Sequence, residues 1–168
     1  MIRAIVVMGA SGCGKSTLGR ALAAQLHWRF IEGDALHPPA NIAKMSSGVP
    51  LTDEDRWPFL ENVGAAIHAA GADGVIVACS ALKRDYRDRI RARAGEVAFV
   101  LPSVDRAHLL ARLAHRREHF MPPTLLDSQL QALEPPQQDE RALVLDGNAS
   151  TEIQVRKVLD AIASNLLQ

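Results

Sequence analysis

The chain has 168 residues, of which 48% are hydrophobic and 23% are charged, so its length and composition suit one compact globular domain. Its 19 basic and 19 acidic residues balance, and no overall positive field favours nucleic acid or an anionic membrane surface. No apolar run approaches the ~20 residues that span a bilayer, the N-terminus lacks a signal-peptide pattern, and two cysteines cannot form a dense disulfide framework, so we expect a cytoplasmic protein.

Short apolar runs alternate with longer amphipathic stretches along the chain. Strands are predicted at residues 4–8, 29–32, 74–79, 97–101 and 142–145, and helices at 17–26, 52–70, 105–117 and from 150 or 151 onward. Pro58 is expected to kink the second of these helices after its first turn. This order predicts an α/β fold, a five-stranded parallel sheet with helices on both faces, in one domain over residues 1–168.

The first turn between a strand and a helix carries the most specific motif. Gly9-Ala10-Ser11-Gly12-Cys13-Gly14-Lys15-Ser16 fits G-x-x-x-x-G-K-[ST] and is followed by Thr17, where the helix begins. Backbone N–H groups of such a P-loop surround a β-phosphate, Lys15 can reach the β- and γ-phosphate oxygens, and Ser16 can bind Mg²⁺. We therefore predict an ATP site at residues 9–17. A glycine-rich turn with an unrelated lysine is the alternative.

Cys13 lies in this loop and Cys79 ends the third predicted strand, so both are expected near the phosphates. Two interpretations are open: the cysteines form an oxidation-sensitive site, or they are small residues that fit and are buried.

An acid follows the second predicted strand, at the sheet edge where ligands bind in open α/β folds. The strand at 74–79 ends without the aspartate that usually completes a magnesium site in P-loop proteins. Asp34 is the candidate to replace it, because its carboxylate can accept the proton of a substrate hydroxyl and touch the water shell of Mg²⁺. An ordinary turn or N-cap aspartate is the alternative interpretation.

Two proline pairs, 122–123 and 135–136, bracket a short helix, at the start of which Thr124 and Asp127 can form a capping box. The segment before it is predicted to be a flap, and residues 116–135 a small helical lid that excludes water. Arg112 and Arg116 lie one turn apart on the helix entering the lid, where they can neutralise phosphate charge, or they can belong to a solvated basic face. The turn at 146–149 is expected near adenine.

Three further segments resemble the bacterial-type gluconokinases. They are Gly33-Asp34-x-x-His37-Pro38-x-x-Asn41-Ile42-x-Lys44-Met45, Gly48-x-Pro50-Leu51-x-Asp53-x-Asp55-Arg56, and Cys79-Ser80-Ala81-Leu82-Lys83-Arg84-x-Tyr86-Arg87-Asp88. The stretch Arg112-x-x-x-Arg116-x-x-x-His119-Phe120-Met121 continues the match. This resemblance implies a P-loop kinase fold, a homodimer, and transfer of the γ-phosphate of ATP, with Mg²⁺, to the 6-hydroxyl of D-gluconate.

Gluconate is a polyhydroxylated monoanion, so its site needs a cation and several hydrogen-bonding groups. Arg56, Lys83, Arg84 and Arg87 are the candidates for the carboxylate, and the resemblance favours Arg56 and Lys83 among them. Residues 83 and 87 are expected to face one ligand from successive helical turns. The remaining candidates for substrate contact are polar residues of the same segments and the lid: His37, Asn41, Lys44, Ser80 and His119. Each cation can instead be a solvated helix charge.

Two other functions remain open at this point. One is another small-molecule kinase, such as a shikimate or nucleoside-monophosphate kinase. Shikimate kinases share the P-loop, an early aspartate and an arginine near position 56 but lack the His-Pro-x-x-Asn-Ile and Cys-Ser-Ala-Leu-Lys stretches. A nucleotide-sensing switch that binds ATP without an acceptor belongs to a different class.

Overall fold

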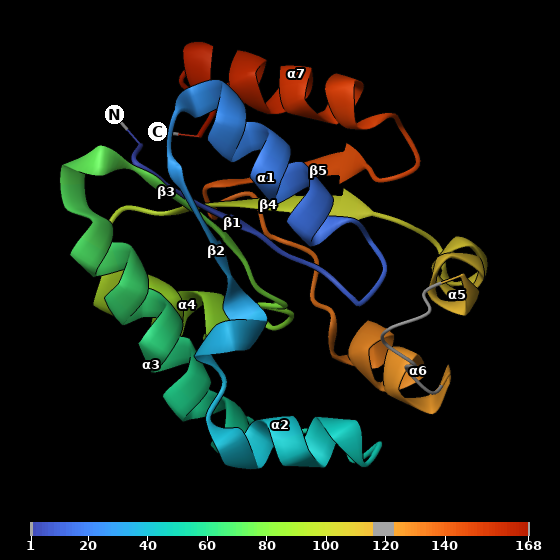
Figure 1. Cartoon of the computed structure of the whole chain (residues 1–168). Coiled ribbons are helices and arrows are strands. Elements are labelled where there is room, and N and C mark those ends of the chain that lie inside the picture. The colour runs from blue at the N-terminus through green and yellow to red at the C-terminus, as the bar shows by residue number, and fades with distance from the viewer. Residues whose placement is uncertain (1, 116–122, 168) are drawn as a thin grey trace.

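A computed structural model describes residues 2–115 and 123–167 of the chain (Figure 1). Five parallel strands form one sheet in the order β2-β3-β1-β4-β5. Their bounds are Ala4–Val7 for β1, Arg29–Glu32 for β2, Val75–Ala78 for β3, Ala98–Ser103 for β4 and Ala142–Asp146 for β5. The parallel α/β prediction is confirmed, and every predicted strand lies within two residues of its observed bounds.

The centre of the sheet is formed by β1, which pairs with β3 on one side and β4 on the other. Every residue of β1 and β3 is buried, which explains why both read as continuous apolar runs rather than alternating ones. Because all strands run the same way, their carboxyl ends share one edge of the sheet. The loops that follow β1, β2 and β3 therefore meet there, as ligand-binding loops do in open α/β folds.

Helices cover both faces of the sheet (Figure 1). On one face lie α1 (Lys15–Leu26) and α7 (Thr151–Ala163), whose buried residues pack with Ile5, Val7 and Ile76 of the strands. On the other lie α3 (Asp53–Ala70) and α4 (Arg84–Ala94), which pack on Val6 and Val77. Alternate residues of one strand thus enter different cores, as the two-residue period of a strand requires.

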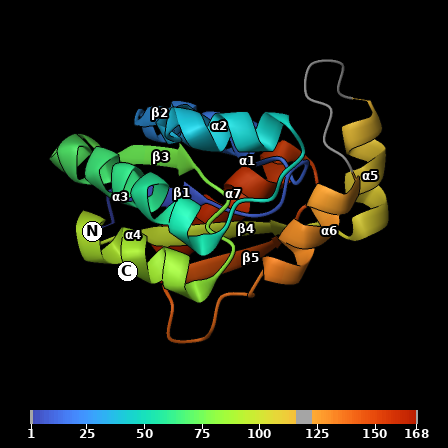
Figure 2. The same ribbon diagram turned by 90° about the horizontal axis from the view of Figure 1, so that it is seen from below.

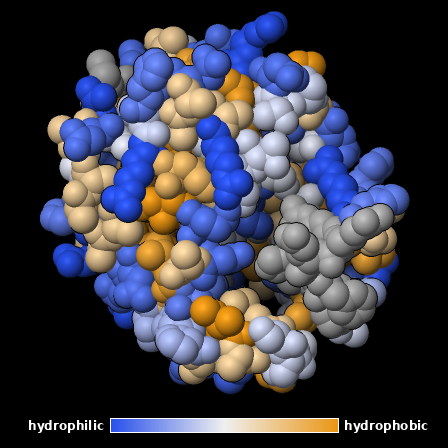
Figure 3. Space-filling model, in the orientation of Figure 1, coloured by the Kyte–Doolittle hydropathy of each residue, from blue (hydrophilic) through white to orange (hydrophobic). Residues whose placement is uncertain are grey.

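The remaining helices lie toward the carboxyl edge. They are η1 (Gly33–Leu36) and α2 (Pro39–Ser46), between β2 and α3, and α5 (Arg106–Ala114) and α6 (Pro123–Ala132), which lie side by side beyond β4 (Figures 1 and 2). A short turn, η2 (Gly71–Asp73), precedes β3. Hydrophobic residues form small patches among hydrophilic ones on the face seen in Figure 3. Across the described residues, no helix has the length and apolar character needed to cross a membrane.

Local capping accounts for most helix starts. Asp105 accepts from the His108 N–H and Ser150 from the Ile153 N–H, so each caps a helix at the start that the sequence predicted, 105 for one and 150 of the two alternatives for the other. Thr52 and Asp55 form a capping box at α3.

Two local predictions were wrong. Pro58 was expected to leave a separate first turn before the main helix, but α3 is one helix from Asp53 to Ala70 with Pro58 inside it. Pro58 is exposed and near the helix start, so the carbonyl that loses its partner can be hydrated. Asp127 does not form a capping box with Thr124, because its carboxylate accepts a hydrogen bond from Arg106 of α5 at 2.6 Å. This contact joins α6 to α5.

Candidate active site

The loop between β1 and α1 has the geometry of an anion site. Gly9, Gly12 and Gly14 have φ values of 130°, 86° and 98°, which residues with a Cβ rarely adopt. Gly14 is the N-cap of α1, so the N–H groups of the first helical turn lack carbonyl partners within the helix and are free for an anion. Lys15 Nζ donates to Ala10 O at 3.1 Å and therefore lies folded over the loop.

Two helices hold this loop from behind. Gln129 of α6 accepts from the Ser11 N–H at 2.8 Å, and Arg112 of α5 donates to Gly12 O at 3.2 Å and to Gly147 O at 2.8 Å. A small apolar cluster fills the space between loop and helices: Ala10, Cys13, Leu109, Leu113 and Leu126. Sequence reasoning gave Gln129 no role at the phosphate loop, because nothing local marks a contact between residues 118 positions apart.

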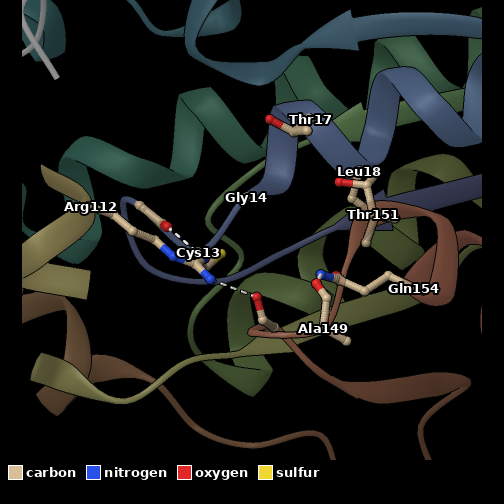
Figure 4. A pocket seen from close by; sticks show the side chains of 10 residues that line it. Cys13, Gly14, Thr17, Leu18, Arg112, Ala149, Thr151 and Gln154 are labelled. Carbon is tan, nitrogen blue, oxygen red and sulfur yellow. Dashed lines mark hydrogen bonds between the residues drawn. The ribbon is translucent and has the colours of Figure 1, made fainter. Parts of the chain in front are cut away.

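A cavity of about 300 Å³ lies between the loop, Arg112 and the segment joining β5 to α7 (Figure 4). This volume is at the lower end of the range for small-molecule sites, roughly 300–1,000 Å³. Gly147 and Ala149, from the turn expected near adenine, line it together with Thr17. Gln154 of α7 also lines the cavity, and its amide donates to Ala149 O at 2.9 Å.

Ser16 is oriented by a residue that sequence reasoning passed over. Its hydroxyl donates to Glu32 Oε1 at 2.8 Å, and Glu32 is the last residue of β2. Because the proton is directed at Glu32, the lone pairs of Ser16 Oγ are left for a cation. A hydroxyl and carboxylates are the hard oxygen donors that Mg²⁺ prefers, so the residues fit this metal. Within residues 2–115 and 123–167, no three His, Cys, Asp or Glu side chains form a metal cluster, which means that phosphate oxygens and water would complete the shell.

Gly33 allows β2 and β3 to approach closely before Asp34. A Cβ on Gly33 would lie 2.1 Å from Ala78 O, which no real contact permits. The close approach places Asp34 in the first turn of η1, just beyond the carboxyl edge, with its side chain exposed. Asp34 thus lies two residues after Glu32, the residue that orients Ser16.

Two cations flank one phenol ring on the other side of this edge. Arg56 Cζ and Lys83 Nζ each lie 5.5 Å from the ring centroid of Tyr86. Lys83 Nζ donates to both carboxylate oxygens of Asp53, at 3.0 and 3.1 Å, and the Tyr86 hydroxyl donates to Asp53 Oδ1. Arg56 donates to Leu51 O and, at 3.4 Å, to the Tyr86 hydroxyl. The structure brings together Arg56 and Lys83, as expected, and adds Asp53 and Tyr86.

His37 and the residues of α2 form the adjoining wall. His37 stacks on Phe59 with ring centroids 3.6 Å apart, and burial lowers its pKa more than nearby Asp34 raises it. Asn41 is buried and donates to Asp55 O at 2.7 Å, and Lys44 binds the Asp55 carboxylate at 2.7 Å. Both α2 residues thus hold α2 against the start of α3.

Arg87 does not face a ligand with Lys83. It is completely buried, and its guanidinium makes five hydrogen bonds, to both oxygens of Glu140 and to the carbonyls of Ala81, Leu82 and Glu134. The expectation of a shared ligand failed because Lys83 precedes the first turn of α4 whereas Arg87 lies on the inward face of the helix.

Ser80 is partly exposed, and its carbonyl accepts from the Gly9 N–H at 3.1 Å, which joins the loop after β3 to the phosphate loop. Cys13 and Cys79 are both buried, and burial raises the pKa of Cys79 to about 12. A thiol with that pKa stays protonated at neutral pH, which favours the interpretation of a small buried residue. Arg116 and His119, and with them the first part of the expected lid, lie outside the described residues.

Comparison with known proteins gives consistent matches. A family model described as an AAA domain matches residues 5–136. A gluconokinase of Gluconobacter oxydans (strain 621H) is 43% identical, over 94% of this chain and 89% of the relative. The thermosensitive gluconokinase of Escherichia coli (strain K12) is 45% identical, over 95% and 89%. The crystal structure of a gluconokinase from Sinorhizobium meliloti 1021 superposes with a TM-score of 0.88 at 46% identity, covering 97% of this chain and 93% of the other.

Proposed function

Because this chain belongs to the gluconokinase family, we propose that it transfers the γ-phosphate of ATP to the 6-hydroxyl of D-gluconate, giving 6-phospho-D-gluconate and ADP. Relatives named as gluconokinases match it along almost its whole length at 43–45% identity. One observation carries the proposal: a phosphate loop, an exposed aspartate and a pair of cations all lie at the same edge of the sheet. An ATP-dependent sugar-acid kinase needs these three groups together.

On the nucleotide side, the N–H groups at the start of α1 bind phosphate, and Lys15 moves from Ala10 O to the β- and γ-phosphate oxygens. Adenine enters the cavity beside Arg112 and the β5–α7 segment. Arg112 and Arg116 neutralise charge on the phosphates during transfer. These backbone and side-chain donors bind the nucleotide without reacting, because phosphoryl transfer depends mainly on positioning and charge.

Mg²⁺ is the proposed metal: Ser16 and, through water, Asp34 would hold it, and it would neutralise charge on the phosphates. Glu32 keeps the Ser16 hydroxyl oriented for that role. Asp34 accepts the proton of the 6-hydroxyl as the bond to phosphorus forms.

On the acceptor side, Arg56 and Lys83 are proposed to bind the gluconate carboxylate, because a guanidinium fork and an ammonium beside one ring offer several donors to one anion. His37, Ser80 and His119 are proposed to contact the hydroxyls, with Lys44 as a further cation. Asn41 is proposed to act in the wall of the site, since its amide is already engaged. We propose a cytoplasmic homodimer in which residues 116–135 act as the lid.

ADP release from Mg-ATP with gluconate, shikimate, AMP or no acceptor tests this function. Release stimulated by gluconate alone is expected. Stimulation by shikimate or AMP would identify a different small-molecule kinase, and ATP binding without any stimulation would favour a nucleotide-sensing switch.

Replacing the proposed base gives a sharper test. Asp34→Asn is expected to lower kcat by about 10²–10⁴-fold, the usual contribution of a positioned base, while ATP still binds. Asp73→Asn is the matched control, because Asp73 is exposed before β3, at the opposite edge of the sheet. Normal turnover in Asp34→Asn would exclude the base role.

A further inference from the structure

Asp53 contacts residues of the proposed carboxylate site, and capping of its own helix does not require these contacts. It is the first residue of α3, and Thr52 and Asp55 already form the capping box there. Its carboxylate instead points to α4, where both oxygens bind Lys83 Nζ and one accepts from the Tyr86 hydroxyl. The contact therefore joins two elements 30 or more residues apart, at the point where the two proposed carboxylate-binding cations converge.

We propose that Asp53 is a positioning residue for gluconate: it holds Lys83 and Tyr86 in the arrangement that binds the substrate carboxylate. This inference rests on the proposed function. Lys83 is a long side chain, about one-third exposed, at the N-cap of α4, and a free lysine there samples many rotamers. With Asp53 on one side and the Tyr86 ring on another, its ammonium is confined, and its remaining N–H is left for a ligand.

Charge supports the same role. The cluster of Arg56, Lys83 and Asp53 carries a net charge of +1, which complements a monoanion. The hydrogen bond from Tyr86, and then that from Lys83, lowers the pKa of Asp53, and the hydrogen bond to Asp53 raises the pKa of Lys83. Both groups therefore remain charged across the neutral range. The nearby Asp55 is compensated by Lys44 and leaves this balance unchanged.

The experiment is a double-mutant cycle read as steady-state constants. Asp53→Asn is expected to raise the KM for gluconate about 3–10-fold, the cost of ordering one freed lysine side chain on binding, with kcat and the KM for ATP little changed. Lys83→Met is expected to raise the same KM by at least about tenfold, since a charged hydrogen bond is lost. Because Asp53 acts through Lys83, Asp53→Asn in the Lys83→Met background should add almost nothing.

Two further variants guard the interpretation. Glu54→Gln removes an exposed acid from the same turn of α3 and should leave all constants unchanged, which separates loss of a first-turn acid from loss of this contact. If Asp53→Asn fails to fold, Tyr86→Phe takes its place, because it keeps the ring and removes only the hydroxyl. It should also raise the KM for gluconate, but by less than the rise expected for Asp53→Asn.

Two results would overturn the inference. An unchanged gluconate KM in Asp53→Asn, alongside a raised one in Lys83→Met, would remove the positioning role and leave the proposed function intact. A full effect of Asp53→Asn in the Lys83→Met background would show that Asp53 does not act by positioning Lys83. Absence of gluconate phosphorylation by the wild type would instead reject the proposed function itself.

Discussion

Arg87→Ala tests whether one buried guanidinium holds together three separate segments of the chain. The side chain projects from α4 and bonds to the loop after β3, to the end of the α6 segment and to Glu140 before β5. Its two bonds to Glu140 are 2.6 and 2.9 Å long, and both side chains are fully buried. Burial alone would raise the pKa of Glu140, but the Arg87 hydrogen bond and the Gln137 N–H together lower it.

The magnitude follows from what the substitution leaves behind. Without Arg87, the Glu140 carboxylate stays buried with only the Gln137 N–H and a more distant Arg91 at 3.6 Å. Removing one partner of a buried ion pair costs about 3–5 kcal/mol of unfolding free energy. For a chain of this size that corresponds to a fall in Tm of roughly 6–20 °C.

The assay is urea denaturation of Arg87→Ala and Arg89→Ala side by side. Arg89 lies on the same helix but pairs with Glu61 at the surface, where both side chains are nearly half exposed. Loss of such a pair costs at most about 1 kcal/mol. If Arg87→Ala loses no more stability than Arg89→Ala, the reasoning about the buried pair is refuted.

Two other predictions concern the substrate edge. Gly33→Ala is expected to lower the free energy of unfolding by about 1–3 kcal/mol and to lower kcat, because its Cβ would lie 2.1 Å from Ala78 O. A melting temperature and a turnover rate equal to those of the wild type would contradict this. Burial lowers the folded-state pKa of His37, so the unfolded chain binds more protons, and stability should fall as pH drops below about 6.5 toward that lowered pKa. His37→Gln should flatten this part of the urea-midpoint profile, and an unchanged profile would exclude His37 as its source.

Much of the fold was readable from the sequence because the relevant signals are local. The apolar runs that became β1 and β3 are continuous because both strands are buried on both faces, and residues 29–32 match β2 at both ends. The phosphate loop is a local motif as well, since its geometry depends on glycines and on the helix that follows at once. Capping at Asp105 is equally local.

The candidate site was predictable only in part. Arg56 and Lys83 were both expected, and they do converge on one ring, but their partner Asp53 was not singled out. Glu32 was also missed, although a second acid two residues before Asp34 was a visible signal. Lys15 and Ser16 needed no tertiary information, because the P-loop itself specifies their place.

The sequence by itself determined which residue types stand at which turns, and with them the parallel sheet, the phosphate loop and the family. Only the tertiary structure decided which of the similar cations can reach the candidate site. Lys83 and Arg87 have the same charge and lie one turn apart. Lys83 meets a partner from α3 at the surface, whereas Arg87 meets Glu140, a buried acid in the segment just before β5. The distinction depends on Asp53 and Glu140, residues 30 and 53 positions away, and no local pattern encodes contacts at that range.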